Sequence, residues 1–436
     1  MDTRSISRHA SVSCRAMATP ELHTNHNVFI LGAGFSADAG LPTIATFMRA
    51  LREAGEHYER GGDNRNAEAI VRVLEYRLRA AGAAYRCVID PDNIEDLFSL
   101  IDTEDGSRGP GSQEDYIRQA IAATVEFARK DYMQAPPRVR LALSSAPGIS
   151  PSVGEPGEDE HFRILHLYDA YLAAMTGMLY EPEPDRRDTI ITFNYDTLVE
   201  EALAGLKKSY DYGFLPEEYS DGRGGGFVTI DPSCPEQLCR SRDETAARVL
   251  KLHGSVNWGL RYVPASASNQ SAAELLVCPT LDALMSHGVD RIFIEPPTWR
   301  KGYGTQGRGI TTVWHEALAA LKTASRIIVI GYSLPLTDVH FRYLLAAGLR
   351  ENISLQEIIF VNPVLNEDAA GRGDMEARIF QILRPELRDR NIIQFRGNTL
   401  GGELIPAYGI PMSVNPDGLY AKLNQNAGNR QTPLIR

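Results

Sequence analysis

The sequence is poor in cysteine, and its few cysteines are scattered along the chain. The 436 residues include five of them, Cys14, Cys87, Cys234, Cys239 and Cys278, and no pair has C-x-x-C spacing. A disulfide framework is therefore not expected, and the reducing cytoplasm is the expected location. Because clustered Cys or His ligands are lacking, we also expect no structural metal and no effect of chelators.

Long apolar runs and a surplus of basic residues are missing as well. No run reaches the roughly 18 apolar residues of a membrane span, and residues 1–26 lack the apolar core of a secretory signal. We therefore expect a disordered leader over residues 1–26 and no membrane association. The net charge of −11, from 45 basic and 56 acidic side chains, argues against direct nucleic-acid binding, which needs a concentrated basic face.

Hydrophobic residues make up 43% of the chain, which is enough for a large core. The length of 436 residues predicts two or three domains. Helix-spaced apolar residues predict a mostly helical insertion over residues 56–185, with one of its helices over 164–179. Strand-like segments flank this insertion. Residues 27–55 and 186–411 are therefore predicted to form one nucleotide-binding domain, followed by a polar tail over residues 412–436.

Short apolar segments predict strands that are buried on both faces, as in a parallel sheet. They are residues 27–31, 189–193, 248–252, 326–330 and 358–361. Small or polar residues stand at the ends of these segments: Gly32, Asn194, His253, Gly331 and Asn362. Ligands of open parallel sheets bind beyond the carboxyl ends of the strands, so these residues should converge on one crevice. The predicted fold class is α/β, a Rossmann-like parallel sheet with helices on both faces, plus the helical insertion.

The turn after the first predicted strand is rich in glycine. Gly32-x-Gly34-x-Ser36 would let backbone amides approach a pyrophosphate closely, with a helix dipole behind them, and side chains at the glycines would block that approach. The pattern is not G-x-G-x-x-G, because Ala37 stands at the third position, and it is not a P-loop. A tight strand–helix turn that binds nothing is the alternative.

Three side chains at later strand ends are candidates for chemistry. The Asn194 amide suits a ribose hydroxyl or a carboxamide, Asp196 can steady a positive ring, and His253 can act as a general base near neutral pH. Each also has a structural alternative. Asn194 and Asp196 could close an Asx-turn, and His253 could be held by backbone hydrogen bonds.

Five segments, in chain order, resemble the motifs of the sirtuins. Gly32–Pro42 resembles G-A-G-x-S-x-x-x-G-x-P, Thr192–Asp196 resembles T-Q-N-x-D, and Leu252–Gly254 resembles the catalytic H-G. Gly331–Leu334 resembles G-T-S-L, and Val361–Asn362 resembles the late Asn. The resemblance implies a sirtuin-like fold that uses NAD+ as its substrate.

The resemblance also implies a role for each matched residue. Asn194 would position the ribose or the attacking water, Asp196 would contact the nicotinamide side, and His253 would be the base. The NAD-binding residues that it implies are Gly32, Ala33, Gly34 and Ser36 at the phosphates, Ser333 and Asn362 beside the adenosine half, and also Gly331.

Departures from the sirtuin pattern point to one branch. Only Cys278 follows His253, so the paired cysteines of the sirtuin zinc module are missing, and Phe193 replaces the Gln before the Asn. Other segments resemble the Sir2-like NADases of bacterial antiphage defence: Asn93–Phe98, Phe193–Glu200, Lys251–Ser255 and Pro296–Lys301. Such effectors hydrolyse NAD+ to nicotinamide and ADP-ribose and deplete the infected cell.

This resemblance implies a homo-oligomer that is controlled by a separate partner, such as a HerA-type ATPase, a short Argonaute or another phage sensor. Two other functions stay open. One is a catalytically inert nucleotide-binding sensor, which the intact Asn194, Asp196 and His253 disfavour. The other is an NAD-dependent protein deacylase or ADP-ribosyltransferase, and the deacylase is disfavoured by the missing zinc module. A hydride-transferring oxidoreductase is least expected, because no acidic ribose clamp follows the glycines.

Overall fold

The structure is a computed structural model. It describes residues 22–104, 111–142, 148–150, 152–156, 162–179, 186–214, 228–241, 243–263, 272–295, 308–335, 338–403 and 409–411. The segment 296–301 and the predicted tail over 412–436 lie outside these residues, as does the predicted leader up to residue 21.

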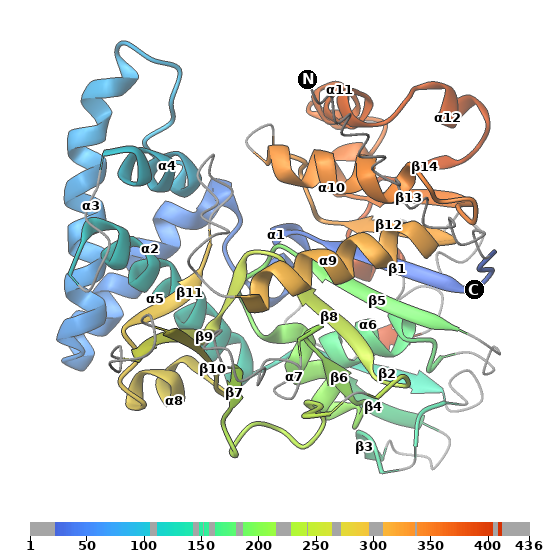
Figure 1. The fold of residues 1–436 in the computed structure, drawn as a ribbon, viewed down its shortest axis with the longest axis horizontal. Helices are drawn as coiled ribbons and strands as arrows, with labels where there is room; N and C mark the ends of the chain where they lie inside the picture. The colour runs from blue at the N-terminus through green and yellow to red at the C-terminus, as the bar shows by residue number, and fades with distance from the viewer. Residues whose placement is uncertain are drawn as a thin grey trace, which may run out of the picture.

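A seven-stranded sheet forms the centre of the molecule, and all of its pairings are parallel (Figure 1). In spatial order its strands are β14 (Ile393–Arg396), β13 (Glu357–Val361), β12 (Arg326–Ile330), β1 (His26–Leu31), β5 (Arg187–Thr192), β8 (Ala247–Lys251) and β6 (Tyr210–Asp211). The inner strands are almost wholly buried because both faces of the sheet are covered, and this explains their continuous apolar sequences.

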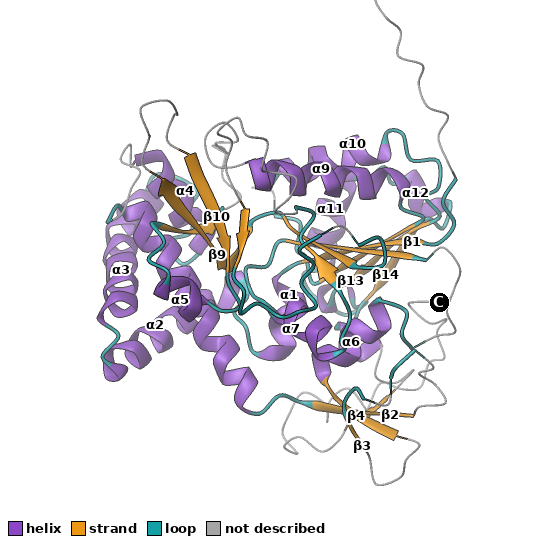
Figure 2. Ribbon diagram, turned by 60° about the horizontal axis from the view of Figure 1, so that its bottom comes forward, coloured by secondary structure: helices purple, strands orange, loops and turns teal. Residues whose placement is uncertain are grey.

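Helices lie on both faces of this sheet. In Figures 1 and 2, α9 (Arg308–Thr323) and α10 (Val339–Leu349) lie on one side, and α6 (Leu167–Met175) and α7 (Leu198–Gly205) lie on the other. Two further helices, α11 (Arg372–Ile382) and α12 (Glu386–Asp389), lie near the β13–β14 edge, where the 3-10 turn η4 (Pro363–Leu365) also falls. The predicted fold class is confirmed by this topology.

A helical layer stands at one end of the sheet, at the left of Figure 1. It consists of α2 (Ile44–Gly61), α3 (Asn64–Ala84), α4 (Ile94–Glu104) and α5 (Gln113–Gln134). These helices pack on one another, and α5 also packs on a second sheet. The helix α2 runs across the predicted domain boundary at residue 55.

The predicted insertion is not helical throughout, and the helix predicted over residues 164–179 is wrong at its start. The structure has β4 (Phe162–His166) there, and α6 begins only at Leu167. The strand pairs with β2 (Arg138–Ala142) and β3 (Glu155–Pro156), and β15 (Gly409–Pro411) completes this small antiparallel sheet. Short apolar runs fit both the helix and the strand period, so the sequence did not separate the two elements.

A second four-stranded sheet, which the sequence reading did not predict, follows β8. Its order is β11 (Arg291–Ile294), β9 (Gly254–Val263), β10 (Ala272–Val277) and β7 (Val228–Ile230), and α8 (Leu281–Ser286) packs on β9. The pair β7–β10 is parallel, whereas β9 is antiparallel to both β10 and β11. Among the described residues, no helix is long and apolar enough to cross a membrane.

Residues before the predicted boundary at residue 27 already pack on the fold. The main-chain N–H of His23 donates to Ser354 Oγ over 2.8 Å, and His26 is a buried residue of β1. The imidazole of His26 contacts the hydroxyls of Thr323 and Thr189 at 2.9 and 3.0 Å. The first strand is therefore anchored to α9 and β5 by a polar side chain that we had assigned to the leader.

Candidate active site

A cavity of about 680 Å³ lies beyond the carboxyl ends of β1, β5, β8, β12 and β13. All ten residues that the sequence nominates line it: Gly32, Ala33, Gly34, Ser36, Asn194, Asp196, His253, Gly331, Ser333 and Asn362. The predicted convergence is therefore present in the fold, because parallel strands place their carboxyl ends on one edge.

The glycine turn packs directly on the loop that follows β12. The N–H of Gly32 donates to Ile330 O at 3.0 Å, and the N–H of Gly34 donates to Gly331 O at 2.8 Å. A Cβ on Gly34 would stand 2.8 Å from Gly331 Cα, and one on Gly32 would stand 2.5 Å from Tyr332 Cα. Contact between two backbones is therefore sufficient to require glycine at both positions, a reason that sequence analysis missed.

The helix after this turn differs from the expected one. The turn leads into α1 (Ala33–Ser36), a single turn, which continues as the 3-10 turn η1 (Ala37–Ala39) and ends at Gly40 with a φ of 75°. The long helix α2 begins only at Ile44. The helix expected directly behind the glycines is therefore only the single turn α1, and not α2.

Two tyrosines of α6 donate hydrogen bonds to the residues that follow the glycine turn. Tyr168 donates its hydroxyl to Phe35 O at 2.6 Å, and Tyr171 donates to Asp38 Oδ2 at 2.7 Å. Burial raises the pKa of Tyr168 well above its ordinary value, and it also raises the pKa of Asp38. Both tyrosines are buried in the core, and their hydroxyls position this wall of the cavity.

A hydrogen-bonded network joins Asn194, Ser36 and Asp196. The Asn194 amide donates to Gly32 O and to Ser36 Oγ, both at 2.9 Å, and Ser36 Oγ donates to Asp196 Oδ2 at 2.7 Å. The second oxygen of Asp196 accepts the N–H of Leu198 at 3.1 Å, which is the Asx-turn alternative. Among the described residues, Asn194 Oδ1 has no hydrogen-bond partner, so this oxygen is the group that Asn194 offers to a ligand in the cavity.

His253 lies in an aromatic and acidic pocket at the end of β8. Its side chain is 5% exposed, its ring packs edge-on against Phe193 at 5.0 Å, and its Nε2 lies 3.9 Å from Asp338 Oδ2. Asp338 accepts the Tyr332 hydroxyl at 2.6 Å and caps α10 by accepting the N–H of Phe341 at 3.1 Å. Asp338 is thus a fixed carboxylate beside the imidazole, and sequence reasoning did not find it.

A buried lysine ties the ends of β5 and β8 together. Lys251 is 1% exposed, and its ammonium donates to Asp196 O and forms an ion pair with Glu200 at 2.9 Å. The strand after His253 is held too, because Val256 N–H and Ser255 Oγ both donate to Tyr195 O. These bonds explain how Asn194, Asp196 and His253 keep their relative positions without a ligand.

The outer end of the cavity contains Ser333, which is exposed, and Asn362. Asn362 Oδ1 accepts the N–H of Val364 at 3.0 Å, so its amide group is the part left to face a ligand. Arg378 of α11 lines the cavity here as well, and its Nε is buried without a hydrogen-bond partner among the described residues. Nothing in the sequence around Arg378 indicated this position.

The inner half of the cavity is apolar and belongs to the helical layer. Its lining residues there are Phe47 of α2, Ile94 and Phe98 of α4, and Ile121 and Val125 of α5. Glu95 of α4 adds a carboxylate to this wall. Burial, with Glu95 and other acidic groups adding to it, raises the pKa of Tyr195 and of Tyr332 far above the ordinary range. The insertion is therefore a wall of the candidate site.

Comparisons with known proteins find a match to a family model and similarity to a group of solved structures. The family model of the SIR2-like domain matches residues 188–369, which include Asn194, His253 and Asn362 but not the glycine turn. Comparison with curated proteins finds no match.

Several solved Sir2 structures are similar to this chain. One holds an inhibitor, 2′-O-acetyl-ADP-ribose and a deacetylated p53 peptide; it is 12% identical, has a TM-score of 0.31, and the match covers 86% of this chain and 89% of that one. A Sir2 complex with a p53 peptide and NAD+ is 12% identical, with a TM-score of 0.32 and coverages of 86% and 88%. A mutant Sir2 homologue with 2′-O-acetyl-ADP-ribose is 13% identical, with a TM-score of 0.32 and coverages of 93% and 94%.

Proposed function

We propose that this protein is an NAD+ glycohydrolase. The reaction adds water across the bond between nicotinamide and ribose, so that NAD+ and water become nicotinamide, ADP-ribose and a proton. The observation that carries the proposal is one cavity that combines the Asn194–Ser36–Asp196 network, the His253–Asp338 pair and the glycine turn. Its volume of about 680 Å³ is in the range of natural ligand sites, about 300–1,000 Å³.

The chemistry of the cavity suits this reaction. Loss of nicotinamide leaves an oxocarbenium-like ribose, as in glycoside hydrolysis, and nicotinamide needs no strong acid to leave. Asn194 Oδ1 would accept from a ribose hydroxyl or from the water. His253 would take the proton of that water, and the neighbouring Asp338 carboxylate would stabilise the imidazolium that forms. Each carboxylate oxygen of Asp196 already accepts a hydrogen bond inside the protein, so its role would be to position Ser36 and Asn194.

The outer residues would hold the other half of the dinucleotide. Asn362 and Ser333 would contact the adenosine ribose, and Arg378 would supply a positive charge for phosphate oxygens. The amides of Gly32 and Gly34 are already used, so the phosphates would rest beside the turn and bind through Ala33, Ser36 and Arg378.

A role in antiphage defence and a regulated assembly belong to the same proposal. The helix α3 has exposed apolar side chains at Val71 and Leu78, 51% and 70% exposed, and Tyr85 follows at 91%. Because Val71 and Leu78 are seven residues apart, they lie on one face of the helix. This face would bind a second copy or a sensor protein such as a HerA-type ATPase, and would restrain an activity that otherwise consumes cellular NAD+.

The direct test is to incubate the purified full-length chain with NAD+ and to quantify nicotinamide and ADP-ribose by chromatography. Equal amounts of both products are expected, with or without an acylated peptide. Product that appears only with the peptide would identify a deacylase instead. Calorimetric NAD+ binding without any product, in the presence of candidate partners, would identify an inert sensor.

The assembly is tested separately by light scattering of the wild-type chain and of Leu78→Glu. We expect an oligomer that Leu78→Glu weakens. A monomer with full activity on its own would contradict the assembly part of the proposal and leave the chemistry unaffected.

A further inference from the structure

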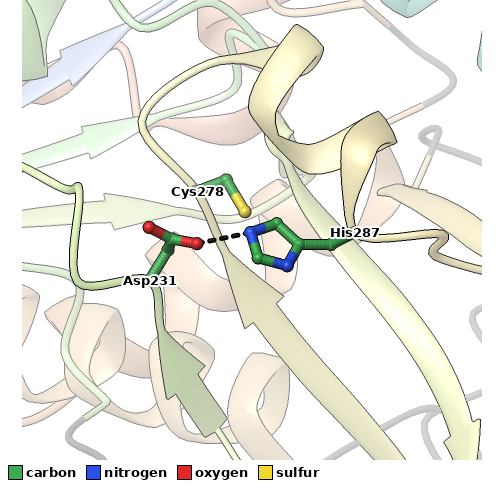
Figure 3. A group of neighbouring side chains, drawn as sticks. All are labelled: Asp231, Cys278 and His287. Carbon is green, nitrogen blue, oxygen red and sulfur yellow. Dashed lines mark ion pairs between the residues drawn. The ribbon is translucent and has the colours of Figure 1, made fainter.

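Three side chains of metal-binding type meet at the second sheet, and none of them lines the cavity described above. Asp231 directly follows β7, Cys278 directly follows β10, and His287 caps the carboxyl end of α8 (Figure 3). The strands β7 and β10 are parallel neighbours, so their carboxyl ends bring Asp231 and Cys278 together. The short α8 then returns the chain so that His287 points at both.

The ligand atoms of these residues are close enough for one ion. The Asp231 carboxylate, the Cys278 thiol and the His287 imidazole each offer an atom, and all three atoms lie within 4.8 Å of one another. Asp231 and Cys278 are 7% and 0% exposed, whereas the His287 side chain is 40% exposed. The cluster therefore has two buried ligands and one side that is open to solvent.

Asp231 is held in place for this role. Its Oδ1 accepts the N–H of Ser233 at 2.7 Å and also the Ser233 hydroxyl, while its Oδ2 faces His287 Nε2 at 2.5 Å. Cys278 is not in a disulfide, and no hydrogen bond of its thiol occurs within the described residues. The buried thiol therefore stands beside an oriented carboxylate and an imidazole.

We propose that Asp231, Cys278 and His287 bind a divalent metal ion of the zinc type, contrary to our expectation from the sequence of no structural metal and no effect of chelators. Thiolate and imidazole ligands together select Zn²⁺ over Mg²⁺ or Ca²⁺, which prefer oxygen ligands alone. Three protein ligands leave the fourth tetrahedral position to water, and the exposed side of His287 gives that water a place. This site rests on geometry alone and is independent of the proposed NAD+ chemistry.

A metal ion requires a small and specific movement. Zinc–ligand bonds of about 2.0–2.3 Å at tetrahedral angles place neighbouring ligand atoms roughly 3.3–3.6 Å apart. The Asp231–His287 contact of 2.5 Å must therefore open by nearly 1 Å, and the Cys278 thiol must lose its proton. His287 can make this movement because it ends α8, is exposed, and is followed by Gly288 with a φ of 64°.

The ion would brace the strand that follows His253. The N–H of Cys278 donates to Asn257 O at 3.0 Å, and Asn257 Nδ2 donates to Cys278 O at 2.7 Å. Asn257 belongs to β9, which begins at Gly254 directly after His253. A metal that joins β7, β10 and α8 would thus stabilise the second sheet as a unit, and the expected effect is structural.

The test uses the full-length chain stripped with a chelator and then titrated with Zn²⁺ and Co²⁺. We expect one metal per chain by elemental analysis, a thiolate-to-Co²⁺ charge-transfer absorption, and a melting temperature raised by roughly a few degrees with Zn²⁺. Cys278→Ser should abolish the Co²⁺ absorption, and His287→Ala should weaken Zn²⁺ affinity at least about 100-fold.

Matched controls separate this site from unspecific binding. Cys239→Ser changes a half-buried thiol outside the cluster, and His315→Ala changes an exposed histidine of α9; both should bind metal like the wild type. Absence of stoichiometric metal, or a Co²⁺ absorption that persists in Cys278→Ser, would overturn the proposal. In either case Asp231 and His287 would be an ion pair only.

Discussion

Reactive side chains follow the carboxyl ends of parallel strands at two places in this molecule: the first edge is that of the central sheet, and the second edge is that of β7 and β10. The two edges differ in the space between their side chains. Beyond the central sheet the groups surround about 680 Å³ of open volume, and hydrogen bonds join Asn194, Ser36 and Asp196 along its wall. Beyond β7 and β10 three ligand atoms approach within 4.8 Å. The first edge has room for a dinucleotide and the second for one ion. The spacing of the groups, more than their types, therefore separates a substrate site from a metal site.

The largest effect on the first edge is expected from Asn194→Ala. The change removes Oδ1 from the cavity and also the two hydrogen bonds to Gly32 O and Ser36 Oγ. NAD+ cleavage should fall below detection while the circular dichroism spectrum stays that of the wild type. The matched control is Asn64→Ala, an exposed position at the start of α3 that should keep full activity. Normal turnover by a folded Asn194→Ala chain would refute the role of Asn194.

Next in size is His253→Ala, which should separate turnover from binding. A general base acts in the transition state and typically contributes roughly 10²–10⁴-fold to the rate. Nicotinamide release should fall by that factor, and the calorimetric affinity for NAD+ should change little, since the outer cavity is intact. Equal loss of binding and turnover would make His253 a ligand contact, and the base would have to be another group.

A third prediction concerns the glycine turn and uses stability as its measure. Gly34→Ala places a Cβ 2.8 Å from Gly331 Cα and O, so two backbones must separate, and we expect a loss of about 1–3 kcal/mol in the free energy of unfolding. Gly82→Ala is the control, because a Cβ there has open space within α3 and should stabilise by up to about 1 kcal/mol. Denaturant unfolding measures both. An unchanged stability for Gly34→Ala would reinstate ligand approach as the reason for that glycine.

The sequence predicted the first edge because its strands are continuous apolar runs. The segments 27–31, 189–193, 248–252, 326–330 and 358–361 coincide closely with β1, β5, β8, β12 and β13. A strand that is buried on both faces needs a continuous apolar sequence, so the polar side chain at its end is easily recognised in the sequence. The edge strand β14 was missed because only Ile393 of its residues is buried.

The second edge could not be predicted in the same way. The strand β7 is three residues long, and β10 mixes alanine and glutamate with its apolar residues. Asp231 and Cys278 are 47 positions apart, and only the parallel pairing of β7 with β10 joins them. Asp338 was missed for a related reason. Its position predicts a helix cap, but its approach to His253 depends on the packing of α10 against the sheet.

A smaller effect on turnover is expected from Asp338→Asn. Asparagine keeps the cap of α10 but removes the charge 3.9 Å from His253 Nε2. The imidazolium formed in the reaction loses its neighbouring charge, and we expect about a tenfold lower kcat, equivalent to about 1.4 kcal/mol. The pH profile of kcat should shift as well, which a purely structural role of Asp338 would not produce. An unchanged profile with an unchanged rate would leave Asp338 as a cap alone.

The smallest expected effect is a change in the pH dependence of stability through α6, which supports the glycine turn. Asp169 accepts the N–H of the helix cap His166, but burial raises its pKa from 3.8 to about 7. The folded state therefore holds the proton more tightly than the unfolded state. The stability from this group is complete below about pH 4, falls as the pH rises toward 7, and stays lost above it.

Asp169→Asn resembles the protonated form and keeps the hydrogen bond of the cap. Its melting temperature should equal that of the wild type at pH 4 and exceed it by roughly 1–3 °C at pH 8. Glu351→Gln is the control of opposite sign, since hydrogen bonds and ion pairs with Lys322 and Arg350 lower the pKa of that exposed carboxylate, and its loss should not raise the melting temperature at pH 8. A variant that is less stable than the wild type at pH 8 would show that the carboxylate form of Asp169 supports α6. Tyr168 and Tyr171, which contact the glycine turn, would then depend on the ionised form of Asp169. Burial of Asp169 disfavours that form.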